Sequence, residues 1–218
     1  AYKLGAWIRD SMAGIGTVTF YDPDTGVFGA LGHGINDVDT TLLMPLQSGS
    51  IMYAEVTDVK RGQSGAPGEL HGTFQVSQDM GSLYANTDSG VFGMLSDKEL
   101  AQGQPVEVAD RSEVKVGDAV ILSNIAGDKV EEYQVEIVRV YPESAGDTRN
   151  MMIKVTDQRL LDATGGIVQG MSGSPILQNG KLIGAVTHVL INDPTQGYGI
   201  LAENMLDTAQ VEQAAGHV

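Results

Sequence analysis

A serine between two glycines is the stretch of this chain best suited to chemistry. It lies in Gly170-Met171-Ser172-Gly173-Ser174-Pro175, which runs directly into an apolar strand. Gly170 and Gly173 permit backbone conformations that a side chain would forbid, and they let a substrate carbonyl approach the chain closely. The amides of Gly170 and Ser172 can then form an oxyanion hole. Ser172 is therefore a candidate nucleophile, and an ordinary turn is the alternative until a base and an acid are found.

A nucleophilic serine needs a base, and the chain offers four histidines. His33 ends the apolar run Val27 to Gly32 and is followed by Gly34, so no bulky neighbour shields it. Imidazole is the side chain best suited to move a proton near neutral pH. His188 lies in an apolar run and is interpreted as a buried core residue, His71 begins a strand, and His217 lies in a tail. His33 is therefore the predicted base.

A second serine motif precedes the first. Gly62-Gln63-Ser64-Gly65-Ala66-Pro67-Gly68 resembles the stretch around Ser172 and lies 108 residues upstream of it (172 − 64). Pro67-Gly68 continues as a turn, whereas Pro175 opens a hairpin that Asn179-Gly180 closes with a type I′ signal. We interpret the similarity as an internal repeat of two barrels, and a nucleophilic Ser64 as the weaker alternative.

Composition excludes several classes of function. The formal net charge of −15 argues against nucleic acid and against an anionic membrane surface as partners. Cysteine is absent, which excludes disulfides, thiolate catalysis and cysteine-based zinc sites. No apolar run approaches the ~20 residues of a membrane span, and the N-terminus has no signal-peptide pattern, so we expect a soluble fragment. Neither a metal nor an organic cofactor is needed for serine chemistry.

The elements that must position these residues are mainly strands. The 28 glycines and the recurring short β-branched runs favour an all-β class with two barrels that share one interface, divided at about 1–105 and 106–218. A short helix is predicted at 158–163 with Asp157 as its N-cap, and a C-terminal helix at 203–215. Strands are predicted on both sides of Asn179-Gly180 and at 4–9, 16–20, 27–32, 51–59, 70–76, 84–85, 90–94, 104–108, 114–122, 130–141, 151–155, 185–191 and 198–202.

A histidine early in the chain and a serine late in it is the layout of double-barrel serine proteases. Several blocks also resemble the stage IV sporulation protein B peptidase family. They are Leu4-Gly5-Ala6-Trp7-Ile8-Arg9-Asp10-Ser11, Ala13-Gly14-Ile15-Gly16-Thr17, Gly29-Ala30-Leu31-Gly32-His33, Thr164-Gly165-Gly166-Ile167-Val168-Gln169 leading into Gly170 to Pro175, Thr187-His188-Val189, Asn192-Asp193-Pro194-Thr195 and Gly197-Tyr198-Gly199.

This resemblance implies a serine endopeptidase with a chymotrypsin-like double β-barrel and a short C-terminal helix. It implies Ser172 as nucleophile, His33 as base and Asp157 as acid. Its members belong to endospore-forming bacteria and act in the space between forespore and mother-cell membranes. They cut a regulatory membrane protein that restrains the processing protease of a late sigma factor, and they cut themselves. The membrane anchor and PDZ module of the full family pattern are missing from these 218 residues, which suggests a trimmed or self-processed core.

Three questions stay open at this level. The usual double-barrel layout would take the acid from the first barrel, at Asp58, Asp79 or Asp88, while Asp157 has the alternative role of a helix cap. A catalytically silent double barrel that binds a protein partner is the alternative function. If Thr164 to Gly170 form the wall of the specificity pocket, it carries no charged residue, which argues against a required basic side chain in the substrate.

Overall fold

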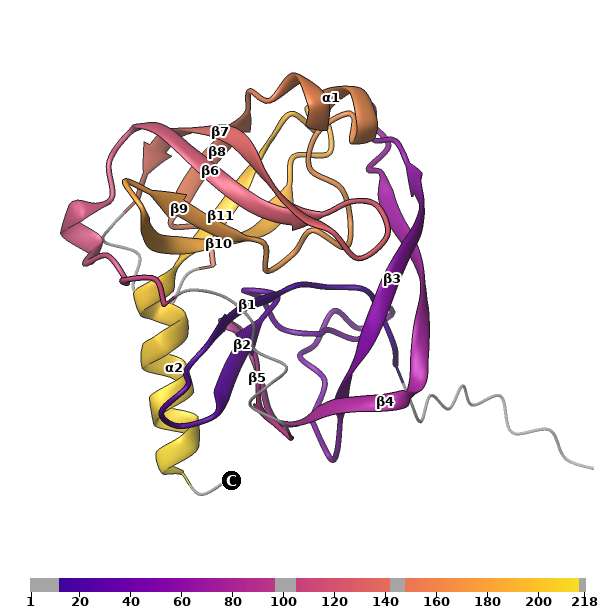
Figure 1. The fold of residues 1–218 in the computed structure, drawn as a ribbon, viewed down its shortest axis with the longest axis vertical. Coiled ribbons are helices and arrows are strands. Elements are labelled where there is room, and N and C mark those ends of the chain that lie inside the picture. The colour runs from indigo at the N-terminus through magenta and orange to yellow at the C-terminus, as the bar shows by residue number, and fades with distance from the viewer. Residues whose placement is uncertain (1–11, 97–104, 142–147, 216–218) are drawn as a thin grey trace, which may run out of the picture.

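The computed structural model describes residues 12–96, 105–141 and 148–215, and it contains two β-sheets that lie one above the other (Figure 1). The first sheet is formed by strands between residues 18 and 95, and the second by strands between residues 117 and 201. The strand predicted at 4–9 falls outside the described residues. The all-β class is confirmed. Among the described residues, helices cover two short segments between 158 and 214, and a 3-10 turn lies at Arg111–Glu113.

The first sheet is open and has the strand order β1-β2-β5-β4-β3. Its strands are β1 (Val18–Tyr21), β2 (Val27–Ala30), β3 (Ser50–Lys60), β4 (Glu69–Thr87) and β5 (Gly90–Leu95). Every residue of β2 is buried, as are the first four of β5, because these neighbouring strands are covered on both faces. The apolar run that precedes His33 is therefore a central strand.

The second sheet is a closed six-stranded barrel with the order β10-β11-β8-β7-β6-β9. Its strands are β6 (Gly117–Asn124), β7 (Val130–Val140), β8 (Met151–Val155), β9 (Pro175–Gln178), β10 (Lys181–Val189) and β11 (Gln196–Leu201). Alternate residues of β6 and β7 point into the barrel, among them Ile121, Tyr133, Val135 and Ile137. The turn at Asn179-Gly180 has φ values of +53° and +78°, as its sequence predicted.

The hairpin of β3 and β4 joins the two sheets. The sequence predicted separate strands at 70–76 and 84–85, but β4 is continuous over 19 residues. Figure 1 shows this hairpin running from the first sheet up to the helix α1 (Gln158–Thr164). Val56 on β3 and Leu70 on β4 belong to the apolar core of the second barrel, and the Val56 and Gly127 backbones exchange two hydrogen bonds. The first sheet thus contributes side chains to the core of the second.

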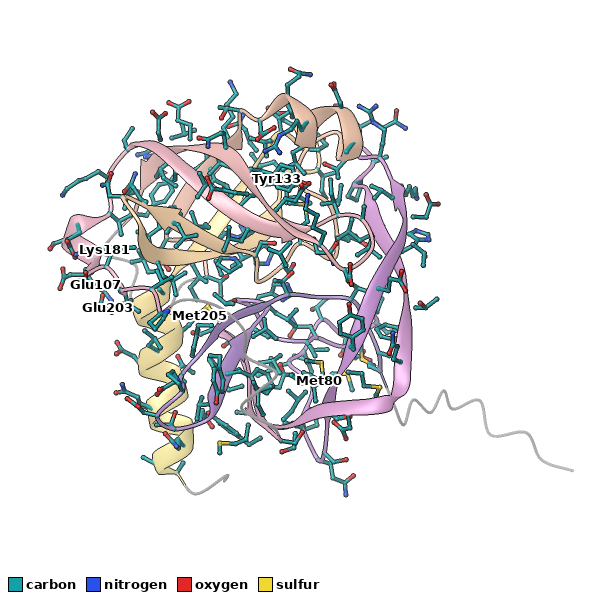
Figure 2. The ribbon with its side chains drawn as sticks, in the orientation of Figure 1. Met80, Glu107, Tyr133, Lys181, Glu203 and Met205 are labelled. Carbon is teal, nitrogen blue, oxygen red and sulfur yellow. The ribbon has the colours of Figure 1, made fainter. Side chains whose placement is uncertain are left out.

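The C-terminal helix α2 (Ala202–Ala214) begins at the second barrel and packs against the first sheet (Figure 1). Met205 and Ala209 share an apolar core with Val27 and Phe92. Figure 2 shows Glu203 at the start of this helix, where its carboxylate pairs with Arg111. The structure thus has two β-sheets and the predicted C-terminal helix, and the first sheet stays open instead of closing into the predicted barrel.

Candidate active site

The loop from Gly170 to Ser174 connects α1 to β9 and presents Ser172 at its turn. Gly170 and Gly173 have φ values of +98° and +90°, a region that side chains rarely adopt. An added Cβ at Gly173 would lie 2.1 Å from the carbonyl oxygen of Thr17, so the loop packs directly on the residue that precedes β1. Ser172 is half-buried, and its Oγ donates to the Thr187 carbonyl of β10 over 3.2 Å. Both glycines therefore adopt the backbone conformations that the sequence suggested.

From Gly170 to Gly173, the backbone amides alternate between those without a hydrogen-bond partner among the described residues and those that donate to a carbonyl. Met171 donates its amide to the Val168 carbonyl at 3.1 Å, and Gly173 donates to Val186 at 2.8 Å. Within the described part of the chain, no hydrogen bond uses the amide of Gly170 or Ser172. These are the two amides predicted to form the oxyanion hole. An oxyanion hole requires amides without a partner in the protein, and that role stays a prediction.

The carbonyl groups of the same loop are held by the first sheet. Thr17 donates its amide to the Ser172 carbonyl at 2.9 Å, and Thr19 donates its hydroxyl to the Gly173 carbonyl at 2.8 Å. Thr19 is 6% exposed, so this bond forms away from water. The local sequence pattern does not indicate either contact, because the partners lie more than 150 residues away. The first sheet therefore fixes one side of the nucleophile loop.

His33 follows a sharp kink at the end of β2. Leu31 has a φ of +68°, which is strained for a leucine, and Gly32 has a φ of +69°. An added Cβ at Gly32 would lie 2.9 Å from Cγ2 of Thr187. The kink thus brings Gly32, which directly precedes His33, beside Thr187, the residue of β10 whose carbonyl accepts from Ser172. No hydrogen bond joins Ser172 to His33 among the residues described.

The His33 ring has a defined tautomer. Its Nδ1 lies 2.9 Å from the Gly34 carbonyl oxygen, and a carbonyl can accept only from a protonated Nδ1. The neutral ring therefore carries its proton on Nδ1 and keeps the lone pair on Nε2. A base that receives the proton of a serine needs this lone pair. The Gly34 carbonyl occupies the Nδ1 position that a carboxylate would take in a Ser-His-Asp triad.

His188 is not the buried core residue that the sequence suggested. It lies near the end of β10, is half-buried, and faces His33 with the two ring centroids 5.3 Å apart. The apolar run around it is real, but Val186 and Thr187 occupy the buried positions. A bulge between Val186 and His188 shifts the register of the strand and turns the imidazole toward the site. The local sequence gave no signal for this bulge.

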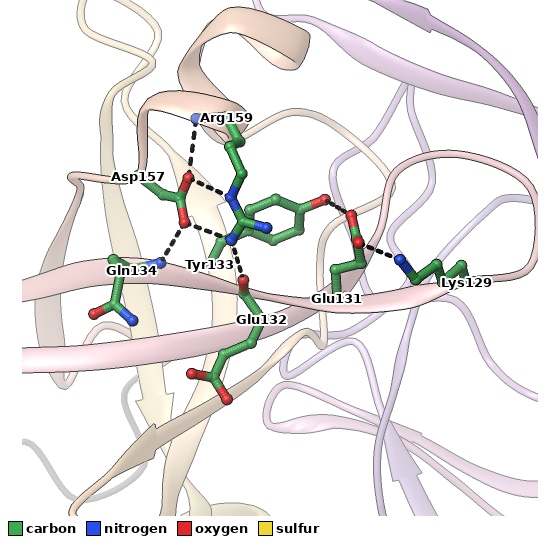
Figure 3. Close-up of polar contacts among 7 residues, drawn as sticks. All are labelled: Lys129, Glu131, Glu132, Tyr133, Gln134, Asp157 and Arg159. Atoms are coloured by element: carbon green, nitrogen blue, oxygen red, sulfur yellow. Dashed lines mark hydrogen bonds and ion pairs between the residues drawn. The ribbon is translucent and has the colours of Figure 1, made fainter.

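Asp157 caps α1, as the helix-cap interpretation predicted, and Figure 3 shows its surroundings. Its carboxylate accepts from the Arg159 amide at 2.9 Å, from the Arg159 guanidinium at 2.8 Å and from the Gln134 amide at 3.2 Å. The guanidinium also lies over the Tyr133 ring. Within the described chain, no hydrogen bond or ion pair connects Asp157 to His33. The structure places Ser172 and His33 next to β10, where they contact Thr187 and His188, and it holds Asp157 at α1.

The electrostatics of Asp157 follow from these contacts. The hydrogen bonds from Arg159 are the largest influence, and with the amides they lower its pKa from 3.8 to about 2. The carboxylate is therefore ionised and strongly held at neutral pH. Beside it, burial together with the hydrogen bond to Glu131 raises the pKa of Tyr133 to about 12, so this phenol stays neutral. Both groups fit a structural cluster.

The three alternative aspartates lie on the first sheet. Asp58 is exposed on β3, and Asp79 accepts from the Gly81 amide within β4. Asp88 lies in the exposed turn between β4 and β5, directly after Thr87. An added Cβ at Gly34 would lie 2.7 Å from the Thr87 carbonyl oxygen. Of the three alternatives, Asp88 directly follows Thr87, and Thr87 lies against Gly34, the residue after His33.

Ser64 lies at the tip of the β3–β4 hairpin and is exposed. Its hydroxyl donates to the Asn192 carbonyl at 2.8 Å, which is a structural contact with the second barrel. As for metals, the described residues contain no group of three or more histidine, aspartate or glutamate side chains that could hold an ion. In the same residues, no helix is long and apolar enough to cross a membrane.

Comparison with known proteins identifies the family to which this chain belongs. The sequence matches the family described as SpoIVB peptidase S55 over residues 1–206. No curated protein matches it. Similar solved structures include the Rv3671c protein of M. tuberculosis H37Rv in an inactive serine-to-alanine form, with 16% identity over 78% of this chain and 85% of that chain and a TM-score of 0.46.

A second similar structure is the HtrA-type protease AlgW with a decapeptide, with 18% identity over 76% of this chain and 51% of that chain and a TM-score of 0.47. A third is a mutant of human heparin binding protein, with 14% identity over 64% of this chain and 69% of that chain and a TM-score of 0.40. From the match over nearly its whole length, the chain belongs to the SpoIVB peptidase S55 family and is a serine endopeptidase.

Proposed function

We propose that this endopeptidase acts through Ser172 as nucleophile and His33 as general base. Ser172 Oγ attacks the scissile carbonyl while Nε2 of His33 takes its proton, which forms a tetrahedral oxyanion. His33 then returns the proton to the leaving amine, and the acyl-enzyme is hydrolysed by water in the same two steps. The Nδ1–H tautomer of His33 supports this role.

The observation that carries the proposal is the pair of unused amides at Gly170 and Ser172, on either side of a bonded Met171 amide. Two donors that converge on the oxyanion contribute several kcal/mol of transition-state stabilisation in such enzymes, about 2.7–4 for a single donor. A serine in an ordinary turn has no need to leave these amides free. Their position beside Ser172 fits acyl transfer.

Asp157 is the acid that the family resemblance nominates, and we retain it in the proposal on that resemblance alone. To act on His33, its carboxylate has to leave Arg159, and Nδ1 of His33 has to exchange the Gly34 carbonyl for it. The proposal therefore includes a rearrangement of both residues before catalysis. Asp157→Asn separates this role from the helix cap, because asparagine keeps the ability to cap and removes the charge.

We further propose the substrate and the setting that the family implies. The substrate is a regulatory membrane protein that restrains the processing protease of a late sporulation sigma factor, and a second substrate is the chain itself. The site of action is the space between the forespore and mother-cell membranes. Thr164 to Gly170 contain no charged residue, which supports a preference for an uncharged side chain before the scissile bond.

Cleavage profiling on a peptide library tests activity and preference together. The wild-type chain should cut a subset of peptides after uncharged residues, and Ser172→Ala should cut none. Self-cleavage is tested by using the Ser172→Ala chain as a substrate for the wild type and following fragments by mass spectrometry. If the Ser172→Ala chain cuts at the same sites as the wild type, the cleavage comes from a contaminating protease, and this result would contradict the proposal.

A further inference from the structure

The peptide between Gln169 and Gly170 carries one of the two oxyanion-hole donors, and its orientation is set from the other sheet. In a planar trans peptide, the carbonyl of one residue and the amide of the next point in opposite directions. The Leu70 amide at the start of β4 donates to the Gln169 carbonyl over 2.8 Å. This bond therefore directs the Gly170 amide away from β4. Within the described chain, no other hydrogen bond to the Gln169 carbonyl is formed.

The side chain of Leu70 supports the same peptide. Leu70 is 4% exposed and belongs to the core of the second barrel, although its strand is part of the first sheet. An added Cβ at Gly170 would lie 3.0 Å from the Leu70 Cβ and 3.2 Å from its Cδ1. The leucine therefore lies directly against the Gly170 backbone. A turn of the 169–170 peptide would have to move this buried side chain.

The start of β4 is itself fixed to the second barrel. The Gln169 amide donates back to the Gly68 carbonyl at 2.9 Å, which makes a short parallel bridge with β4. At the hairpin tip, Gly62 donates to the Thr164 carbonyl at 2.8 Å and Gly65 donates to Ile191 at 2.9 Å. An added Cβ at Gly165 would lie 2.3 Å from the Gly62 carbonyl oxygen. These backbones touch so closely that Leu70 has little freedom to shift.

The second donor is oriented differently. The Met171 carbonyl shares its peptide with the Ser172 amide, and it accepts from the Ser174 amide at 3.0 Å. This bond lies within the nucleophile loop. One half of the oxyanion hole is thus held locally, and the other half depends on the β3–β4 hairpin.

On the basis of the proposed function, we propose that Leu70 is a positioning residue that orients the oxyanion hole through the 169–170 peptide. The docked hairpin holds the Gly170 amide toward the substrate oxyanion, and undocking of the hairpin removes this donor while Ser172 and His33 stay in place. The β3–β4 hairpin thereby couples the first sheet to transition-state stabilisation.

The test compares Leu70→Ala with Leu70→Met and with the control Leu182→Ala. Leu182 is a similarly buried leucine on β10, at 7% exposure, whose neighbours Leu177 and Ala109 lie outside the nucleophile loop. For each purified variant, kcat and KM are measured on a library-derived peptide, the inhibition constant is measured for a peptide aldehyde, and folding is checked by circular dichroism and thermal unfolding. The aldehyde forms an adduct with serine whose oxygen occupies the oxyanion hole.

Leu70→Ala should lower kcat by about 10- to 100-fold and weaken aldehyde inhibition in parallel, because a donor of the oxyanion hole is lost. KM should stay within about threefold, since ground-state binding is not affected. Leu70→Met should restore kcat to within about threefold, and Leu182→Ala should keep kcat despite a similar loss of thermal stability. Wild-type kcat in a folded Leu70→Ala variant, or an equal kcat loss in Leu182→Ala, would overturn this inference while the proposed function stands. A wild-type chain without turnover or serine labelling would contradict the proposed function, and this inference with it.

Discussion

The imidazole rings of His33 and His188 lie with their centroids 5.3 Å apart and their planes inclined by 41°. His188 thus limits where the proposed base can move. We expect His188→Ala to lower kcat/KM by about tenfold, since small displacements of a catalytic group are costly. His188→Phe should recover most of this loss because it restores a ring at the same place. His71→Ala, at an exposed position of β4, is the control and should keep full activity. Unchanged kcat/KM in His188→Ala would show that the contact has no catalytic role.

The close packing of the nucleophile loop on β1 predicts very different costs for two similar substitutions. Gly173 and Gly180 both have positive φ, +90° and +78°. An alanine Cβ at Gly173 would meet the Thr17 carbonyl at 2.1 Å, whereas nothing lies within 4 Å of one at Gly180. Gly180→Ala should therefore cost only the backbone strain, about 1–2 kcal/mol. Gly173→Ala should lower the free energy of unfolding by more than this and should abolish labelling of Ser172. Urea unfolding measures the stability of both variants, and equal stabilities would contradict the tight contact with Thr17.

The acid assignment makes a demanding prediction for Asp157→Asn. Asparagine keeps the ability to cap α1, so a residue that acts only as a cap should tolerate it with near-normal turnover. If Asp157 is the catalytic acid, turnover should fall by roughly 10⁴, as when a triad aspartate is lost. Steady-state kinetics on a library-derived peptide decides this. Turnover within about tenfold of wild type, with a collapse in Asp88→Asn, Asp58→Asn or Asp79→Asn, would move the acid to the first sheet.

The same variant has a defined effect on acid stability. The pKa of Asp157 is lowered from 3.8 to about 2, so the native state favours its ionised form. This contribution is complete above about pH 4 and is lost as the pH falls through about 2. The stability difference between wild type and Asp157→Asn should therefore shrink between pH 4 and pH 2. Urea unfolding across this range measures it, and a difference that stays constant would contradict the ion pair with Arg159.

The sequence predicted those parts of the fold that depend on local patterns. The strands around His33, the hairpin at Asn179-Gly180 and the helix capped by Asp157 all follow from turn residues, alternation or a capping side chain. The sequence also predicted two short strands, at 70–76 and 84–85, where the structure has the continuous strand β4. A strand that leaves one sheet and packs on another has no simple alternation, because its buried face changes along its length.

The parts that the sequence missed depend on contacts between distant segments. Thr17, Thr19 and Leu70 act on the nucleophile loop across 99 to 155 residues of chain (169 − 70 and 172 − 17), and nothing in their local patterns signals this. His188 was interpreted as a fully buried core residue because an apolar run indicates burial, while the bulge next to its half-buried ring is a tertiary feature. The sequence nominates Ser172 and His33 by type and setting, and their catalytic roles stay a prediction. It could not identify the residues that hold them.

The most direct test of Ser172 as the nucleophile is labelling with a fluorophosphonate probe, which reacts with an activated serine hydroxyl. The wild-type chain, Ser172→Ala, His33→Ala and Ser64→Ala are treated in parallel, their folding is checked by circular dichroism, and the modified residue is located by peptide mass spectrometry. We expect stoichiometric modification of Ser172 in the wild type and in Ser64→Ala, strongly slowed modification in His33→Ala, and none in Ser172→Ala. Modification at Ser64, or equal labelling of folded Ser172→Ala, would contradict the assignment of Ser172 as the nucleophile.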